Sequence, residues 1–278
     1  MKRTLAILLV VLCGLAAFAQ MAAPPSESDL AAITQKGILL AEYDQAAWHA
    51  TDAVQALKPP QGETTGYIAR KVGDEWTVVF GRLNESGDKY LVVYEVKGSL
   101  TPKTLTVKKV DPPREEAGFF LSAAKAIQTV LKDFQRENRP YNVAVLPANP
   151  LQLYVYIMPA QTQSDVYPLG GDARYLIGDE GGTIVVKRQL HKTILEMPAV
   201  PSGAQANLGF HTHVITDLPE DTDVFHVLSR RGQMPEIITT HSYAYQVQTD
   251  GSITCLGKTD KFLQLMKKLD GKEKSKKN

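Results

Sequence analysis

Two histidines two positions apart are the residues of this chain best suited to chemistry. His211 and His213 lie in the predicted strand Leu208–Ile215, where residues two apart face the same side. Two neutral imidazole nitrogens on one rigid strand provide half of a tetrahedral zinc site. Asp223, in the first turn of a predicted helix, can supply a third ligand and leave a fourth position for water. We therefore expect these three residues to hold a metal, with zinc as the candidate.

The other histidines near this segment leave an alternative open. His226 lies three residues after Asp223, on about the same helix face, so it is either an alternative ligand or a histidine packed among apolar neighbours. His191 and His241 have no potential ligand close to them in sequence, and we expect both to lie outside the site. Because a chain with six histidines often contains this spacing by chance, the surrounding elements must support the interpretation.

The order of predicted elements around the histidine pair resembles the core of the JAMM metalloproteases, also called JAB or MPN-like. Their motif is His-x-His-Pro, a loop and Ser-x-x-Asp, with a glutamate upstream. The resemblance covers about residues 115–256 and implies that His211, His213 and Asp223 bind zinc. It also implies a glutamate that acts as general base on the zinc-bound water, and Glu137 is the nearest equivalent in position.

The chain departs from that motif at the positions that support catalysis. Val214 stands in place of the proline and Glu220 in place of the serine, and Glu137 matches the glutamate only approximately. These departures favour an exported, non-catalytic or weakly active JAMM-like protein with a binding or assembly role at the cell envelope. The alternative is an exported zinc-dependent hydrolase of peptide or amide bonds.

The N-terminus is typical of a cleavable signal peptide over residues 1–19. Met1-Lys2-Arg3 precedes an apolar run from Leu5 to Phe18, and Ala17-Phe18-Ala19 has the small-x-small pattern of a cleavage site. A polar tether over 20–28 follows. We expect a periplasmic or secreted protein without a transmembrane span in the mature chain, because no later apolar run reaches the length that crosses a bilayer.

Composition limits both the partners and the covalent chemistry. The formal net charge of +1 gives no reason to expect a nucleic-acid partner, so we expect a protein or peptide partner of unknown identity. After signal cleavage Cys255 is the remaining cysteine, and no internal disulfide can form. Stability must therefore come from an apolar core.

The remaining pattern predicts an α+β fold in which strands dominate. An N-terminal region over 29–112 combines a helix from Asp29 to Leu57 with an antiparallel meander, and Asp111-Pro112-Pro113 marks the boundary to a JAMM-like region over 113–258. The second region begins with a helix over Glu115–Glu137. A later helix from about Leu218 starts with an Asp217 and Glu220 capping box. Over 259–278 we expect a short helix to Leu269 and a Lys-rich disordered tail.

Overall fold

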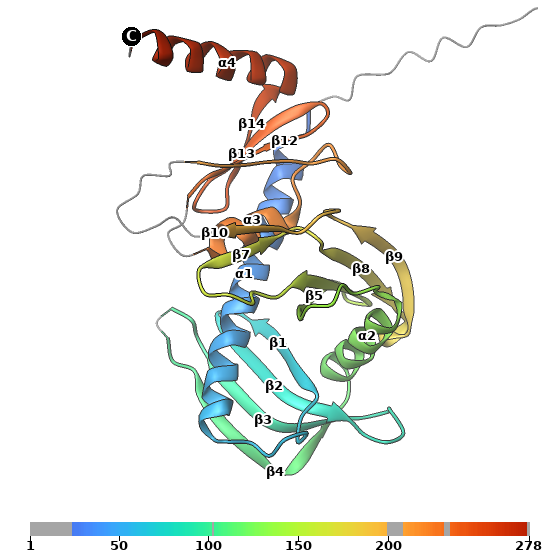
Figure 1. Cartoon of the computed structure of the whole chain (residues 1–278). Helices are drawn as coiled ribbons and strands as arrows, with labels where there is room; N and C mark the ends of the chain where they lie inside the picture. Colours follow the sequence, from blue (N-terminus) through green and yellow to red (C-terminus); the bar gives the residue numbers. More distant parts are fainter. Residues whose placement is uncertain (1–23, 102, 199–207, 231–233, 277–278) are drawn as a thin grey trace, which may run out of the picture.

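The computed structural model describes residues 24–101, 103–198, 208–230 and 234–276 (Figure 1). Its helices are α1 (Glu27–Ala56), α2 (Phe119–Asp133), α3 (Asp221–Ser229) and α4 (Thr259–Lys276), and its strands form three four-stranded sheets and one two-stranded sheet over these ranges. The predicted α+β class is confirmed. The predicted signal peptide lies outside the described residues.

The first sheet is the predicted antiparallel meander, and it packs against α1. It contains β1 (Gly66–Val72), β2 (Glu75–Leu83), β3 (Tyr90–Gly98) and β4 (Thr106–Glu116) in sequence order. Side chains alternate between the two faces, as a strand requires. Val78 therefore packs in the core cluster of α1, whereas Val79 packs in the cluster that contains residues of α2. The sheet thus lies between these two helices.

β4 runs through Asp111-Pro112-Pro113, the residues at which the sequence pattern predicted a boundary between two regions. Its last residue, Glu116, pairs with Tyr90 of β3. Proline is tolerated here because β4 is an edge strand whose pairing with β3 is interrupted between Lys109 and Arg114, so Pro112 and Pro113 have no paired residue in β3. The second helix consequently begins at Phe119 rather than Glu115 and ends at Asp133 rather than Glu137.

The second sheet follows α2 and contains β5 (Tyr141–Asn149), β6 (Gln152–Pro159), β8 (Ala173–Gly178) and β9 (Thr183–Gln189), all antiparallel. Two short strands that the sequence pattern did not predict, β7 (Val166–Leu169) and β10 (Leu195–Pro198), pair with each other. Leu146 and Tyr156 of this sheet share a core cluster with α1 and with Val78 of the first sheet. One apolar core therefore spans the predicted boundary at residue 112.

The third sheet carries the histidine pair. Its order is β11 (Gly209–Thr212), β12 (Glu236–Thr239), β13 (Tyr243–Val247) and β14 (Ile253–Lys258), and β11 and β12 are parallel. A parallel pair needs a crossover connection, and α3 lies in that connection. The helix begins at Asp221 rather than about Leu218, with a capping box formed by Glu220 and Asp223. Asp217 instead accepts hydrogen bonds from the N–H and the hydroxyl of Ser242.

A close approach of two helices places α3. At Gly37 of α1 an added Cβ would lie 2.4 Å from Cβ of Val224 and 2.7 Å from the carbonyl oxygen of Asp221. The absence of a side chain at this position thus lets α3 pack directly against α1. Cys255 of β14 is half-buried, packs against the apolar cluster that includes Val224 of α3, and has a free thiol.

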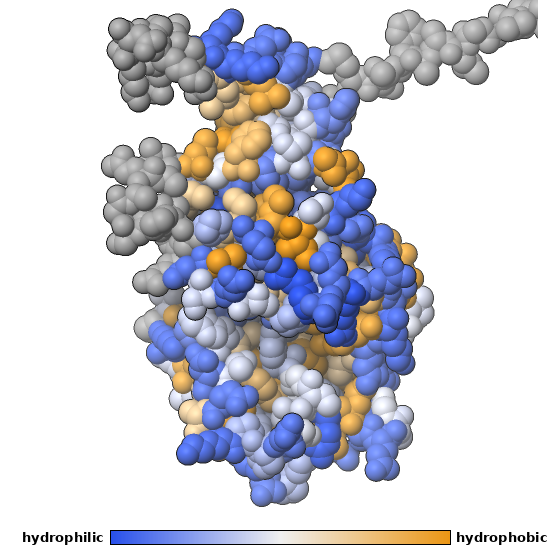
Figure 2. Space-filling view, viewed as in Figure 1, coloured by the Kyte–Doolittle hydropathy of each residue, from blue (hydrophilic) through white to orange (hydrophobic). Residues whose placement is uncertain are grey.

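The helix α4 continues to Lys276, beyond the predicted end at Leu269, and extends away from the rest of the molecule (Figure 1). Figure 2 shows hydrophobic patches on the middle and upper parts of one face, separated by hydrophilic residues. Among the described residues, no helix combines the length and the apolar character needed to cross a membrane.

Candidate metal centre

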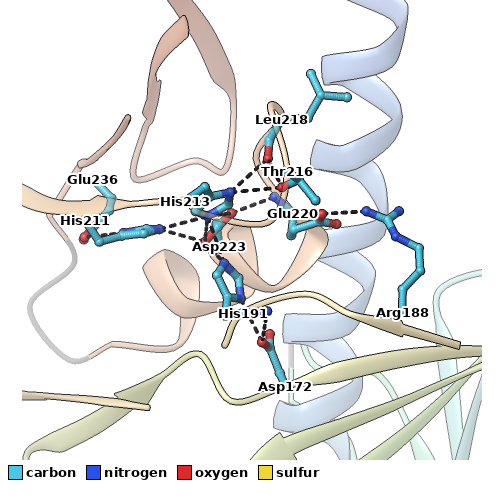
Figure 3. A network of polar contacts seen from close by, with 10 residues as sticks. All are labelled: Asp172, Arg188, His191, His211, His213, Thr216, Leu218, Glu220, Asp223 and Glu236. Atoms are coloured by element: carbon cyan, nitrogen blue, oxygen red, sulfur yellow. Dashed lines mark hydrogen bonds and ion pairs between the residues drawn. The ribbon is translucent and has the colours of Figure 1, made fainter. Parts of the chain in front are cut away.

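Four side chains from separate elements meet at one point, and each offers one atom that could bind a metal. They are His191, just after β9, His211 in β11, His213, which follows β11, and Asp223 in the first turn of α3. Their four potential ligand atoms all lie within 4.8 Å of one another. Figure 3 shows the three imidazole rings and the carboxylate directed toward a common centre.

The spacing of these atoms fits a tetrahedral metal site. A zinc ion with Zn–N bonds of about 2.0–2.1 Å has neighbouring tetrahedral ligands about 3.3 Å apart. Nε2 of His213 lies 2.9 Å from Nε2 of His191 and 3.2 Å from Nε2 of His211. Oδ1 of Asp223 lies 3.1 Å from Nε2 of His191 and 3.1 Å from Nε2 of His211. The ligands are therefore already at about the separation that a bound zinc ion requires.

The outer nitrogen of each imidazole has an acceptor as its partner. Nδ1 of His191 donates to Oδ1 of Asp172 at 2.8 Å, and Nδ1 of His211 donates to Oε1 of Glu236 at 3.0 Å. Nδ1 of His213 donates to the carbonyl oxygen of Leu218 at 3.0 Å. Carboxylate and carbonyl oxygens accept but do not donate, so all three Nδ1 atoms carry the proton. Metal-binding histidines typically have such partners, which fix the tautomer and the ring orientation.

With this tautomer assignment the centre contains hydrogen-bond acceptors but no donor. With the protons on Nδ1, the three Nε2 atoms of neutral rings direct lone pairs at one another and at the carboxylate of Asp223. Four acceptors without a donor are unfavourable in a buried site. Either added protons or a metal ion must lie between them, and the nearly equal spacing suits a single metal ion.

Asp223 is held in place by the start of its own helix. Its Oδ2 accepts a hydrogen bond from the backbone N–H of Glu220 at 2.6 Å and lies 3.2 Å from Nε2 of His213, while Oδ1 lies 3.1 Å from Nε2 of His191 and of His211. The carboxylate of Glu220 is held by Arg188 at 2.8 Å (Figure 3). Because one oxygen is used by the capping box, Asp223 can offer a metal one oxygen, as a tetrahedral site needs.

The buried charges around the centre balance when a divalent cation is added. Asp172, Asp223 and Glu236 supply three carboxylates, and Arg230 supplies one guanidinium, whose Nη2 lies 2.8 Å from Oε2 of Glu236. With neutral imidazoles two negative charges remain. Buried charges are costly unless they are paired, so this shell favours a 2+ ion.

Without a metal, the same carboxylates favour protonated histidines. Burial lowers the pKa of His191, but Asp172 and Asp223 outweigh this effect and hold it well above its usual value. Burial likewise opposes the charged form of His211, yet the bonds to Asp223 and Glu236 raise its pKa to about 9. Burial raises the pKa of Asp223, but the neighbouring histidines more than offset this and keep it well below the usual range. A metal must therefore displace protons when it binds.

The structure brings together the three predicted ligands and adds one. His211, His213 and Asp223 are all members of the group, whereas the expectation that His191 lies outside it is wrong. His191 follows β9, and it reaches the centre only because the second sheet packs beside β11 and α3. No local pattern could have revealed this, since its partner Asp172 is far from it in sequence.

The remaining two predicted site residues lie outside the group. His226 is buried, and its Nε2 has no hydrogen-bond partner among the described residues. Burial lowers the pKa of His226 to about 3, so the ring is neutral. Glu137 lies on the exposed segment between α2 and β5 and is not a member of the ligand group.

A cavity of about 230 Å³ lies beside the histidines. Its wall includes His191, His211 and His213 together with apolar side chains, among them Leu190 and Val214. The centre is therefore buried on most sides and reachable on one.

The comparisons with known proteins give this chain no family. No family model matches it, and no curated protein and no solved structure is significantly similar to it. A function can therefore be inferred only from the sequence and from the geometry of the centre.

Proposed function

We propose that this chain is an exported binding or assembly protein of the cell envelope and is JAMM-like in its C-terminal part. Its metal centre holds zinc in a structural role and has little or no catalytic activity. The observation that carries the proposal is the fourth ligand. His191 completes a set of four protein ligands with His211, His213 and Asp223. Four protein ligands are typical of structural zinc sites, whereas catalytic sites keep one position open.

The carboxylates near the centre support the same proposal. A hydrolytic site needs a carboxylate free to act as general base. Asp172 and Glu236 are both engaged by imidazole Nδ1 atoms, and Glu220 is engaged by Arg188 and the start of α3. Glu137, the predicted base, lies on an exposed segment outside the ligand group. Among the described residues around the centre, the acids thus already have structural partners.

Zinc is the metal that this donor set fits best. Three imidazole nitrogens and one carboxylate oxygen at tetrahedral spacing are typical of zinc, which is almost always tetrahedral in structural sites. Imidazole also suits copper, nickel and iron, but copper(II) and nickel prefer square-planar or tetragonal arrangements.

Metal analysis of the purified mature protein tests the proposal. We expect about one zinc ion per chain. His211→Ala should abolish zinc binding, and His191→Ala should weaken it. The matched control is His241→Ala, because His241 is exposed and outside the ligand group. If the native protein contains no stoichiometric metal after preparation without chelators, or if His241→Ala loses the metal as His211→Ala does, the proposal is wrong.

The alternative function, an exported zinc-dependent hydrolase of peptide or amide bonds, has one observation in its favour. The cavity beside the three histidines would give a substrate access to the metal. The two functions differ in the role of His191. If the centre is structural, zinc-loaded protein has no peptidase or amidase activity and His191→Ala does not create it. Activity that requires His211 and His213 would establish the alternative.

Export is the part of the proposal that the N-terminal sequence supports. The charged start, the apolar run and Ala17-Phe18-Ala19 predict cleavage after Ala19. Mass spectrometry of the protein recovered from the periplasm or the medium should find Gln20 as its first residue. Recovery of the intact chain in the cytoplasm would contradict this expectation.

A further inference from the structure

A second, larger cavity lies between α1, α3 and the strands near them. It has a volume of about 670 Å³, within the range of small-molecule sites of about 300–1,000 Å³. None of the four potential metal ligands belongs to its wall, so it is a separate site.

Aromatic rings form a large part of its wall. They are Trp48 of α1, Tyr67 of β1, Tyr167 of β7 and Phe225 of α3. The side chain of Trp48 is 61% exposed, which is unusual for so large an apolar ring. Tryptophan also has the ring face that attracts cations most strongly.

An acid without a partner lies beside this tryptophan. Asp44 precedes Trp48 by four residues on α1, so the two side chains share one helix face. Asp44 is half-buried in the cavity wall, and no hydrogen bond or ion pair joins it to another described residue. Burial raises its pKa to about 6, and no nearby cation opposes that shift.

The basic side chains in the wall do not balance this charge. Arg230 pairs with Glu236 at 2.8 Å, on the side of the metal centre. His226 is neutral, because burial lowers its pKa to about 3. Among the wall residues, Asp44 therefore leaves one unbalanced negative charge facing a cavity with aromatic sides. An ionised carboxylate in such a place is costly unless a cation joins it.

We propose that this cavity binds an organic ammonium cation, with Asp44 as its counter-ion and Trp48 packed against its alkyl substituents. The aromatic rings would replace the water around the cation, and the carboxylate would set the requirement for charge. None of the four potential metal ligands lines this cavity, so ammonium binding can be tested separately from the proposed function.

Calorimetric titration of the mature protein tests the proposal, with tryptophan fluorescence as a second measurement. Choline and butylammonium serve as probes, and three compounds of matched shape serve as comparisons: the uncharged carbon isostere of choline, butanol and butyrate. We expect saturable binding of at least one ammonium probe at millimolar or lower concentration, and binding of its uncharged counterpart weaker by roughly tenfold or more. Fluorescence should report binding through Trp48, because Trp76, the other tryptophan, is buried.

Variants decide whether Asp44 is responsible. Asp44→Asn keeps the size of the side chain but removes the charge, and we expect it to weaken ammonium binding by roughly tenfold. Asp52→Asn is the matched control, because Asp52 is exposed on α1 and is not part of the cavity wall. The proposal is overturned if neither ammonium probe binds saturably, if an uncharged compound or butyrate binds equally well, or if Asp44→Asn binds like the native protein.

Discussion

The side chains that hold the histidines matter as much as the histidines themselves. Asp172, Glu236 and the carbonyl of Leu218 each accept a hydrogen bond from one imidazole Nδ1–H. These three contacts direct the Nε2 lone pairs inward, which is the arrangement that a bound metal ion would require.

Removing one of these acceptors should weaken metal binding without removing a ligand. Oδ1 of Asp172 accepts from both the backbone N–H and Nδ1 of His191. We expect Asp172→Ala to lower zinc affinity by roughly 10–100-fold, and Asp172→Asn to have a smaller effect because an amide oxygen can still accept. Competition with a chelating dye measures the affinity. The exposed Asp250, whose side chain accepts hydrogen bonds from Ser252 and is not a member of the ligand group, provides the control Asp250→Asn. Equal affinity in Asp172→Ala and the control would contradict the role of Asp172.

Asp44 should make the stability of the protein depend on pH. Its pKa is raised from 3.8 to about 6 by burial, so its ionised form costs stability. The cost is absent below about pH 4, grows between about pH 4 and 6, and is complete above that range. We expect Asp44→Asn to be more stable than the native protein by about 1–2 kcal/mol near pH 7 and equal to it near pH 4. Urea unfolding at both pH values measures this difference. A variant that is less stable near pH 7 would show that the carboxylate has a stabilising partner.

Among the elements, α3 has the greatest influence on the centre. It carries Asp223, it connects the parallel strands β11 and β12, and it packs on α1 at Gly37. The position of one ligand therefore depends on a contact between helices that are distant in the sequence.

A small substitution at that contact should affect both stability and metal affinity. Alanine favours a helix over glycine by about 1 kcal/mol, so an isolated helix would gain from Gly37→Ala. Here the added Cβ would lie 2.4 Å from Cβ of Val224, so α3 must move. We expect a net loss of about 1–3 kcal/mol in unfolding free energy, together with weaker zinc binding because Asp223 moves with α3. Gly66→Ala is the control, since an added Cβ there meets no atom within 4 Å. A stabilised Gly37→Ala with unchanged zinc affinity would mean that the contact can relax.

For the whole molecule, a metal at the centre would add a link between the second sheet and α3, which side-chain contacts such as Tyr156–Asp221 and Arg188–Glu220 already connect. His191 and Asp172 come from the second sheet and the segments next to it, whereas His211 and Asp223 come from the third sheet and α3. The first sheet and its core with α1 contain none of these residues. A bound metal would therefore act as a cross-link between the second and third sheets.

Removal of the metal should destabilise the molecule unevenly. At a free zinc concentration of 100 times Kd, zinc binding raises the free energy of unfolding by about 2.7 kcal/mol. We expect a chelator to lower the unfolding temperature and to speed hydrogen exchange in β11 and α3 much more than in β2 and β3. Adding zinc back should reverse both effects. The same chelator has no effect on a protein that binds no metal, so His211→Ala is the control. Equal changes in all four elements would contradict the cross-link.

The sequence by itself determined the α+β class, most of the strands of the first two sheets and three of the four potential metal ligands. These features follow from local alternation of apolar residues and from spacing on one strand and the next helix. Only the tertiary structure decided that His191 joins the centre, that Asp172 and Glu236 orient the rings, and that β4 runs through its prolines. The reason is physical: packing between sheets brings together residues that no periodicity relates, and an unpaired irregularity in an edge strand removes the penalty that proline carries elsewhere in a sheet.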